Sequence, residues 1–183
     1  KWAGDSFETR KKIPVNARSP SCRACSAHDP ANWMTYPEAL HCHKEWKSRG
    51  VELHLGFVLT KQDPFACIDL DGCRHADSGH IEPWAQQIVD ELQSYTEVSP
   101  SGTGLKTIVR LSDSTFPRMQ KKLDVPKICP KAPGIDVFST KQFAAITFQL
   151  HQFESIEDRS ERVQLLLQRF DNECEEKDKL EEF

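Results

Sequence analysis

Two carboxylates lie one residue apart at the end of an apolar stretch, Phe65-Ala-Cys-Ile-Asp-Leu-Asp71. Successive side chains of a strand point to opposite faces, so Asp69 and Asp71 should share one face while Ile68 and Leu70 turn to the core. Two like charges this close repel, and a divalent cation, which prefers carboxylate oxygens, neutralises them most easily. The pattern therefore predicts a metal site at the end of a buried strand. The alternative is a solvated pair of acids at a strand-to-turn junction, because Asp-Gly is an ordinary turn signal.

A loop rich in glycine and hydroxyl groups, Ser99-Pro-Ser-Gly-Thr-Gly104, precedes an expected strand over 105–110. Backbone amides beside glycines can approach an anion closely, and hydroxyl groups can donate to it. The loop is not a P-loop, which would need a helix after it. The alternative is an ordinary hairpin turn, since Ser, Pro and Gly make up most of them. The candidate anion-binding residues, which could contact the phosphates of a ligand, are Ser99, Ser101, Gly102, Thr103, Gly104 and Lys106.

A third acid, Asp136, lies on another short apolar stretch, Gly134-Ile-Asp-Val-Phe138. It repeats the pattern of a buried strand that exposes a carboxylate. Four basic residues are candidates for contacts with DNA or phosphate, although a solvated surface cluster is the alternative for the first two. These residues are Lys11, Lys12, Arg110 and Lys141.

Cys22 and Cys25 have the two-residue spacing of a zinc half-site, and further His and Cys residues follow as far as His43. The second half-site lacks ligand spacing, because His41 to His43 are expected on a helix where neighbouring side chains diverge. We therefore expect reduced cysteines here and no structural zinc.

Hydrophobic periodicity and turn residues divide the chain into a mixture of helices and strands. An extended arm reaches to about Trp33. We expect helices over 36–48, from about 83 to 93, and after a capping box formed by Ser155 and Asp158. We expect strands over 53–60, 65–71, 95–98, 105–110, 134–138 and 141–147, with the first two forming a hairpin.

The 183 residues carry a net charge of −4 and seven cysteines. The length permits one sizeable core or two small lobes. No apolar run approaches the roughly 18 residues needed to span a membrane. An odd number of scattered cysteines favours a reducing compartment, so we expect a cytoplasmic protein without a membrane partner. The net charge argues weakly against a nucleic-acid partner, but much of it comes from the acidic segment 171–183.

Several of these motifs together resemble the primase-polymerase domain of the archaeo-eukaryotic primase superfamily, of the small kind found on phages, plasmids and other mobile elements. The pair of acids and the Ser-Pro-Ser-Gly-x-Gly loop, at this separation, are specific as a combination. The matching segments are Lys12-Ile-Pro14, Asp29-Pro-Ala-Asn-Trp33, Gly56-Phe-Val-Leu59, Ile68-Asp-Leu-Asp71, Ser99–Gly104 and Ile135-Asp-Val-Phe138.

The resemblance implies an α+β fold of two small α/β lobes, in which an RRM-like catalytic module and an N-terminal αβ unit form a primase-polymerase core. That domain would comprise residues 1–170, including the extended arm 1–33. Residues 171–183 would be an acidic C-terminal tail or linker.

The resemblance also implies a DNA-directed nucleotidyltransferase. Asp69, Asp71 and Asp136 would hold two Mg²⁺ or Mn²⁺ ions, and the Ser101 to Gly104 loop with the residue two beyond it would grip a nucleoside triphosphate. The partners would be a single-stranded DNA template, a primer and a helicase in the same or another protein, and the protein would be associated with the nucleoid.

The sequence departs from this family at two places. Relatives usually carry His where this chain has Lys106, and Lys offers a point charge in place of a directed hydrogen bond. The final strand of relatives tends to carry Arg-Phe or Arg-Tyr and then Thr-Gly, whereas this chain has Gln142-Phe143 and Thr147-Phe148.

Two other functions compete with this one. A nucleic-acid-binding replication module could keep the fold with weak or lost activity, which Lys106 favours. A haloacid-dehalogenase-type phosphatase could use Asp69 as nucleophile and Asp71 as acid. That family, however, expects Thr where Cys73 stands and a late pair of acids, and the sequence has neither.

Overall fold

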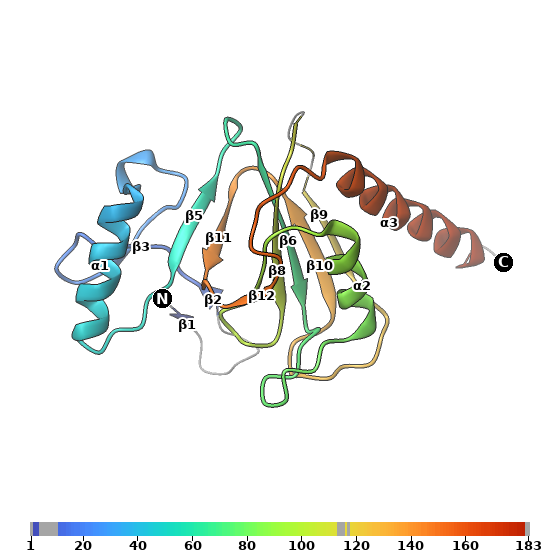
Figure 1. The fold of residues 1–183 in the computed structure, drawn as a ribbon, viewed down its shortest axis with the longest axis horizontal. Coiled ribbons are helices and arrows are strands. Elements are labelled where there is room, and N and C mark those ends of the chain that lie inside the picture. Colours follow the sequence, from blue (N-terminus) through green and yellow to red (C-terminus); the bar gives the residue numbers. More distant parts are fainter. Residues whose placement is uncertain (1, 4–10, 113–115, 117, 182–183) are drawn as a thin grey trace.

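Strand β6 (Phe65–Asp71) lies at the centre of the computed structural model. The structure describes residues 2–3, 11–112, 116 and 118–181. At residues 2, 3, 11 and 171–181 it describes the backbone alone. Strand β6 pairs with antiparallel neighbours on both sides in a six-stranded sheet of order β12-β7-β8-β6-β10-β9 (Figure 1). The other strands of this sheet are β7 (Thr96–Val98), β8 (Leu105–Arg110), β9 (Met119–Lys122), β10 (Gly134–Phe138) and β12 (Leu150–Gln152).

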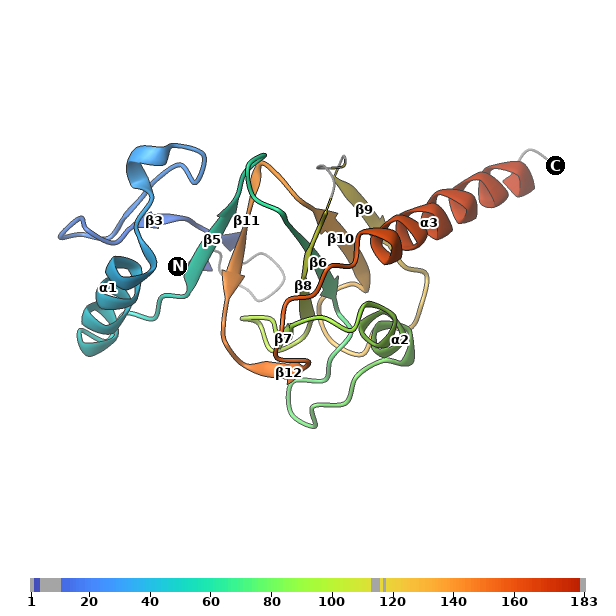
Figure 2. The same ribbon diagram turned by 45° about the horizontal axis from the view of Figure 1, so that its top comes forward.

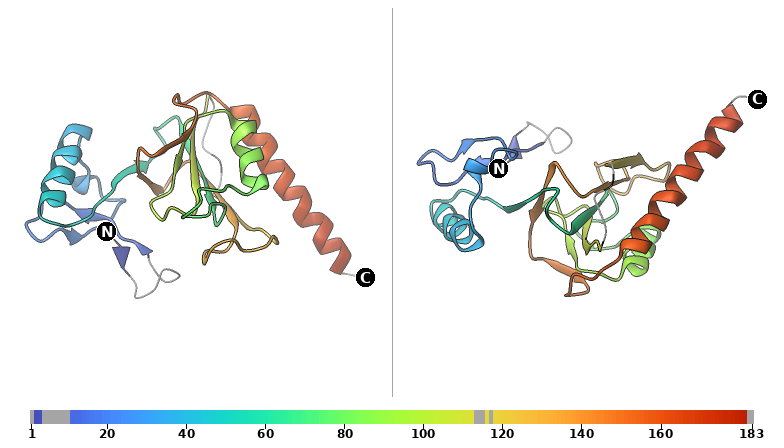
Figure 3. Two further views of the ribbon diagram at one scale, coloured as in Figure 1. Left: turned by 60° about the horizontal axis from the view of Figure 1, so that its bottom comes forward. Right: turned by 90° about the horizontal axis from the view of Figure 1, so that it is seen from above.

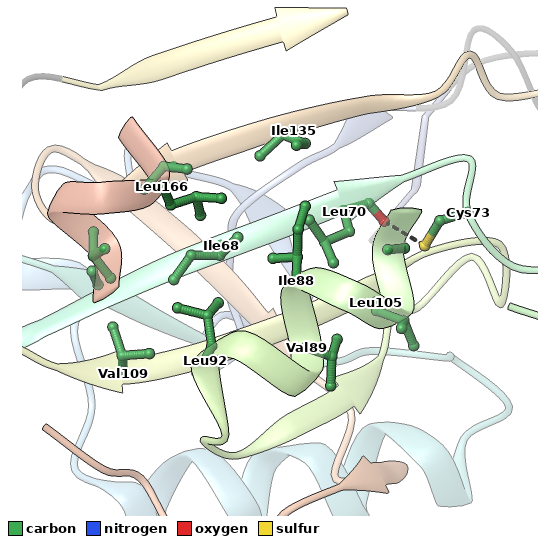
Figure 4. Packing of buried hydrophobic residues seen from close by; sticks show 14 of the residues in the cluster. Ile68, Leu70, Cys73, Ile88, Val89, Leu92, Leu105, Val109, Ile135 and Leu166 are labelled. Carbon is green, nitrogen blue, oxygen red and sulfur yellow. Dashed lines mark hydrogen bonds between the residues drawn. The ribbon is translucent and has the colours of Figure 1, made fainter. Parts of the chain in front are cut away.

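The main hydrophobic core lies on one face of this sheet, beneath α2 (Pro83–Leu92) and α3 (Ser160–Glu181). Ile68 and Leu70 are fully buried there, and side chains of both helices pack against them (Figure 4). Each such side chain contributes roughly 1.5–3 kcal/mol by leaving water. The alternation expected of this stretch is confirmed, so its two acids lie on the opposite face.

A second, smaller sheet packs against part of that opposite face. It consists of β5 (Leu55–Leu59) and β11 (Gln142–Ile146). A separate apolar cluster joins the two sheets and includes Leu59, Cys67, Phe138 and Ala144. The expected hairpin between β5 and β6 is therefore wrong. A turn closed by Asp63, which accepts from the backbone N–H of Thr60 at 2.7 Å, carries the chain from one sheet to the other.

The N-terminal segments and α1 (Tyr36–Ser48) flank the smaller sheet on the side away from α3 (Figures 2 and 3). The indole of Trp46 on α1 donates to the carbonyl of Ala17 at 2.9 Å, which ties the arm to the helix. The arm contains only short elements, as expected of a loop-rich segment. They are β1 (Trp2–Ala3), β2 (Lys11–Lys12), β3 (Val15–Asn16), β4 (Arg23–Ala24) and the 3₁₀ turn Pro30–Asn32.

The helices largely follow their sequence signals. α1 has the expected bounds and begins with a capping box between Thr35 and Glu38. The last helix begins later than expected. Asp158 accepts from the backbone N–H of Ser160 at 3.2 Å, and the chain before it forms β12 on the free edge of β7. α3 then continues through the acidic segment as far as Glu181.

Three α-helices and antiparallel sheets, in the part of the chain that the structure describes, confirm the expected α+β class. Within the described residues, no helix is both long enough and apolar enough to cross a membrane.

Gly104 gives a test of this packing. A Cβ atom there would stand 2.5 Å from the carbonyl oxygen of Leu70, whereas one at Gly56 would have nothing nearer than 3.8 Å. We expect Gly104→Ala to lower the free energy of unfolding by about 1–3 kcal/mol, because backbone must shift to relieve the clash. Gly56→Ala is the matched control, and urea denaturation should show a much smaller change for it. Equal changes would contradict the close approach of the two strands.

Candidate active site

Three charged side chains lie in one row across the centre of the large sheet. Asp69 on β6 is paired in register with Asp136 on β10 and with Lys106 on β8. Directly paired residues of antiparallel strands project from the same face with Cβ atoms about 4.5–5.5 Å apart. Asp71 lies two residues further along β6 and therefore on that face too. The structure thus brings together the three acids that the sequence singles out.

Asp69 has 14% of its side chain exposed, as does Asp136, whereas Asp71 has 28% exposed. The Oδ2 atom of Asp69 lies 4.0 Å from the ammonium of Lys12, and its buried Oδ1 atom has no hydrogen-bond partner among the described residues. Burial alone would raise the pKa of Asp69, but the positive charges of Lys106 and Lys12 outweigh burial and hold it below its ordinary value. The carboxyl group is therefore kept ionised.

Asp71 has the opposite electrostatic environment. Burial and the charge of Asp69 raise its pKa, and the ammonium of Lys131, which pairs with its Oδ1 atom, only partly opposes them. The two acids therefore hold their protons to different extents. A positive charge placed between them would relieve the repulsion that raises the pKa of Asp71.

Asp136 is held by two side chains from the start of β9. The guanidinium of Arg118 donates to both carboxylate oxygens, with the Nε–Oδ1 distance at 2.8 Å, and the Gln120 amide donates to Oδ2 at 3.1 Å. A bidentate ion pair of this kind fixes the orientation of the carboxylate. Arg118 and Lys131 are themselves partly exposed, at 39% and 42%, so both can turn toward solvent.

The chemistry of the row fits a hard divalent cation. It offers carboxylate oxygens, which Mg²⁺ and Mn²⁺ prefer, and one of them, Asp69 Oδ1, is buried without a partner. As the side chains stand, however, no three His, Cys, Asp or Glu residues in the described part of the chain converge into a metal site. Metal binding would require Lys131 and Arg118 to release Asp71 and Asp136.

The same observation bears on the Cys22 and Cys25 pair. Both are free thiols, and no third ligand joins them among the residues that the structure describes.

The Ser99–Gly104 loop connects β7 to β8 at the end of β6 that carries Asp71. Its hydroxyl groups form a chain, from Ser99 to Ser101 at 2.9 Å and from Ser101 to Thr103 at 3.0 Å. Gly102 adopts φ +74°, a conformation that favours glycine. Arg74 closes the loop from outside by donating to the carbonyl of Gly102 at 2.8 Å. Loop and acids therefore lie at the same end of the strands.

Lys106 is engaged within the protein. It is 1% exposed, and its ammonium donates to the carbonyl of Ala145 on β11 at 2.6 Å. It lies in the row between Asp69 and Glu97 of β7. A contact with a triphosphate would require the bond to β11 to break, so in this arrangement Lys106 stabilises the acid row from within.

The other predicted basic residues are divided between the two ends of the strands. Lys12 reaches Asp69, whereas the side chain of Lys11 lies outside the described residues. Arg110 ends β8 four residues beyond Lys106, about 13 Å away along the strand. Lys141 lies in the turn between β10 and β11 with φ +54°. The structure does not bring Arg110 or Lys141 to the acids.

Sequence reasoning missed three charged residues that contact the row or continue it. Arg118 begins a short basic stretch that ends at Lys122, and Lys131 lies in a proline-rich loop with no periodic signal. Glu97 is fully buried on a short strand. The alternation of β7 could have identified Glu97 as inward-facing, but nothing local signals the other two.

A cleft of about 300 Å³ lies between the smaller sheet and the N-terminal arm. Its walls include Trp33, Phe57 and Phe143, and it extends to Lys12 and Pro100. Since Lys12 contacts Asp69 and Pro100 belongs to the loop, one end of this mostly apolar space adjoins the acids.

Over 146 residues, 80% of this chain, the sequence is 32% identical to a protein named DNA primase-polymerase from Nitratiruptor phage NrS-1. The matched region is 19% of the phage protein, so the chain spans about a fifth of its length. No protein-family model matches the chain. The similarity supports a primase-polymerase family for this chain, in agreement with the resemblance carried by its motifs.

Lys106→Met tests the electrostatics of the row. Removing a buried cation beside Asp69 and Glu97 leaves their charges uncompensated, and we expect a loss of about 3–5 kcal/mol in the free energy of unfolding at neutral pH. Because the pKa of Asp69 is lower in the folded state than in the unfolded state, its ionised form stabilises the fold at pH values above the unfolded-state pKa. This contribution is lost as the pH falls through the folded-state pKa. The difference between wild type and variant should therefore shrink in acid.

The control is Lys122→Met on exposed β9, for which denaturation curves should move by less than about 0.5 kcal/mol. If Lys106→Met lowers the free energy of unfolding by the same amount in neutral and in acid solution, the electrostatic role of Lys106 is contradicted.

Proposed function

We propose that this chain is the catalytic core of a DNA primase-polymerase, which adds nucleotides to a DNA strand under the direction of a single-stranded template. The in-register pair of Asp69 and Asp136 carries this proposal, with Asp71 beside them and the Ser99–Gly104 loop at the same end of the sheet. The similarity to a phage DNA primase-polymerase supports it independently. The superfamily and the mobile-element origin suggested by the motifs belong to the same proposal.

The acids have distinct roles in this proposal. Asp69, ionised and with Oδ1 free of other donors, is the main ligand for two Mg²⁺ or Mn²⁺ ions, which Asp71 and Asp136 also hold. When bound, the ions would neutralise the triphosphate and lower the pKa of the primer hydroxyl group. None of the acids attacks phosphorus.

The chain's own groups would position the substrates. The hydroxyl groups of Ser101 and Thr103 and the backbone amides at Gly102 and Gly104 contact phosphate oxygens. Lys131, released from Asp71, becomes available to the triphosphate, and Lys12 lies between the acids and the cleft. The cleft provides space for the base and sugar of a nucleotide. A helicase, in the same protein or separate, is the further partner proposed.

A nucleic-acid-binding module without turnover is the second candidate. The observation that favours it is the engagement of all the nearby cations with protein groups, above all Lys106 with β11. A phosphatase with Asp69 as nucleophile has less support, since the phage relative is a primase-polymerase.

Template-directed extension tests the proposal. Purified protein with a primed single-stranded template, a nucleoside triphosphate and Mg²⁺ or Mn²⁺ should extend the primer. We expect Asp69→Asn and Asp136→Asn each to lower the rate at least about 100-fold, equivalent to about 2.7 kcal/mol of barrier, because each loses a charged metal ligand.

Glu161→Gln, which changes an exposed acid on α3, the helix that covers the opposite face of the sheet, is the control and should retain the rate. Wild-type protein that binds the template but incorporates no nucleotide with either metal would favour the binding module. Full activity in Asp69→Asn would exclude the assigned site.

A further inference from the structure

The smaller sheet turns a face with little side-chain bulk toward the cleft. Gly56 on β5 is paired in register with Ala145 on β11, and Val58 with Phe143, so these four residues share one face. All four line the cleft. The nearest heavy atom to a Cβ atom at Gly56, chain neighbours aside, would be Cδ2 of Phe143 at 3.8 Å. Gly56 and Ala145 therefore form a flat area with open space above it.

Two aromatic rings belong to the lining around this flat area. Phe143 lies beside Gly56 on the sheet, and Trp33 joins the lining from the N-terminal arm. The indole N–H of Trp33 donates to the carbonyl of Ala27 at 2.8 Å, which fixes the orientation of the ring, although the residue is 38% exposed. An aromatic ring that is held in place and still accessible is a surface on which a planar base can stack.

One end of the cleft adjoins the acid row. Lys12 lines the cleft, and its ammonium lies 4.0 Å from Oδ2 of Asp69. Pro100, also in the lining, belongs to the hydroxyl-rich loop between β7 and β8. A ligand with its phosphates at the acids and this loop can therefore extend its other end into the cleft.

The backbone of the flat area is itself bonded to the acid row. The carbonyl of Ala145 accepts from the ammonium of Lys106 at 2.6 Å, and Lys106 is paired in register with Asp69. Because sheets stacked face to face lie about 10 Å apart, the flat area is one sheet layer away from the acids. Its position relative to them is fixed by a buried hydrogen bond.

The size and charge of the cleft suit a nucleobase. Its volume of about 300 Å³ lies at the lower end of the range of roughly 300–1,000 Å³ for small-ligand sites, which are mostly apolar with a few polar groups. Among the described residues that line it, Lys12, at the end nearest the acids, is the only Asp, Glu, Lys or Arg. Burial lowers the pKa of His54, another lining residue, so its imidazole is neutral at pH 7. The cleft therefore favours an uncharged planar group over a phosphate.

We propose that the incoming nucleoside triphosphate places its base on the flat area of Gly56 and Ala145, beside the rings of Trp33 and Phe143. The proposal rests on the function proposed above and adds a base-binding surface to it. The missing side chain of Gly56 leaves the space that the base occupies. Lys12 lies where the nucleoside passes from the cleft to the acids.

The decisive variant is Gly56→Val, which fills the space above the flat area. Glycine weakens a strand and valine favours one, so urea denaturation should show a variant at least as stable as wild type. One methylene too many in a pocket weakens a ligand roughly 10- to 200-fold, so we expect the Kd of dATP to rise by at least about 10-fold. Isothermal titration calorimetry with dATP and Mg²⁺, without primer or template, measures this Kd. Gly56→Ala, which adds less bulk, should show a smaller rise.

A second pair of variants tests the stacking. Trp33→Leu removes a ring from the lining, and we expect a roughly 5- to 150-fold weaker Kd for dATP, the usual effect of losing one stacked ring. Trp33→Phe keeps a ring and should restore most of the affinity. Tyr36→Leu removes a ring that is 60% exposed on α1 and lies outside the lining, so it should leave the Kd unchanged.

A DNA-binding measurement identifies which substrate uses the cleft. Fluorescence anisotropy with a fluorescein-labelled oligo(dT) should give the same Kd for wild type and Gly56→Val, because the base on the flat area belongs to the nucleotide. If Gly56→Val weakens oligo(dT) and leaves the Kd of dATP unchanged, the cleft holds a base of the template strand and the proposal is overturned.

The outcomes separate this inference from the function on which it rests. If wild type extends a primer and Gly56→Val binds dATP as tightly as wild type, the base-binding surface is overturned while the polymerase proposal stands. If wild type extends no primer but binds dATP, and Gly56→Val weakens that binding, the surface is supported and the polymerase proposal fails. Equal losses in Trp33→Leu and Tyr36→Leu, or no binding of dATP by wild type, would overturn the surface.

Discussion

The antiparallel register of β10, β6, β8 and β7 is the constraint on which the site depends. It aligns Asp136, Asp69, Lys106 and Glu97 in a single row, although Asp69 and Asp136 are 67 positions apart in the sequence. The opposite face of the same strands is apolar and packed beneath two helices (Figure 4). A slip of one residue would send the charges into the core and the apolar side chains into the site, so hydrophobic burial itself fixes where the acids stand.

The acids of the row are balanced by cations that differ in mobility. Lys106 is locked between two acids and bonded to β11, so it is a permanent internal counter-ion. Arg118 and Lys131 balance the outer acids from flexible, partly exposed positions. The inner cation therefore stabilises the fold, whereas the outer cations can exchange with other positive charges. This division explains how three acids can stay close together in a stable sheet and still be open to a ligand.

Local patterns predicted much of this arrangement. The alternation in 65–71 identified the core face and the acid face, and strands 105–110 and 134–138 have the expected bounds. The helix expected over 36–48 is confirmed as α1. Each of these signals depends on neighbours within a few residues, which a single sequence displays directly.

Features that depend on distant partners could not be predicted in this way. β5 pairs with β11, more than 80 residues later, and no property of β5 distinguishes that partner from β6. Lys131 meets Asp71 through a loop without periodicity. Lys106 was predicted to bind phosphate, because the carbonyl group that its ammonium contacts belongs to the distant strand β11.

The central claim is that the acid row binds divalent metal together with a nucleotide. Its most direct test is a crystal structure of the protein with Mn²⁺ and a nucleoside triphosphate, with the metal located by anomalous scattering. We expect a manganese peak within about 2.0–2.6 Å of carboxylate oxygens of Asp69 and at least one of Asp71 and Asp136, with Lys131 or Arg118 displaced and the triphosphate at the Ser99–Gly104 loop. A nucleotide bound elsewhere, or a row that retains both ion pairs and no metal at saturating Mn²⁺, would contradict the account.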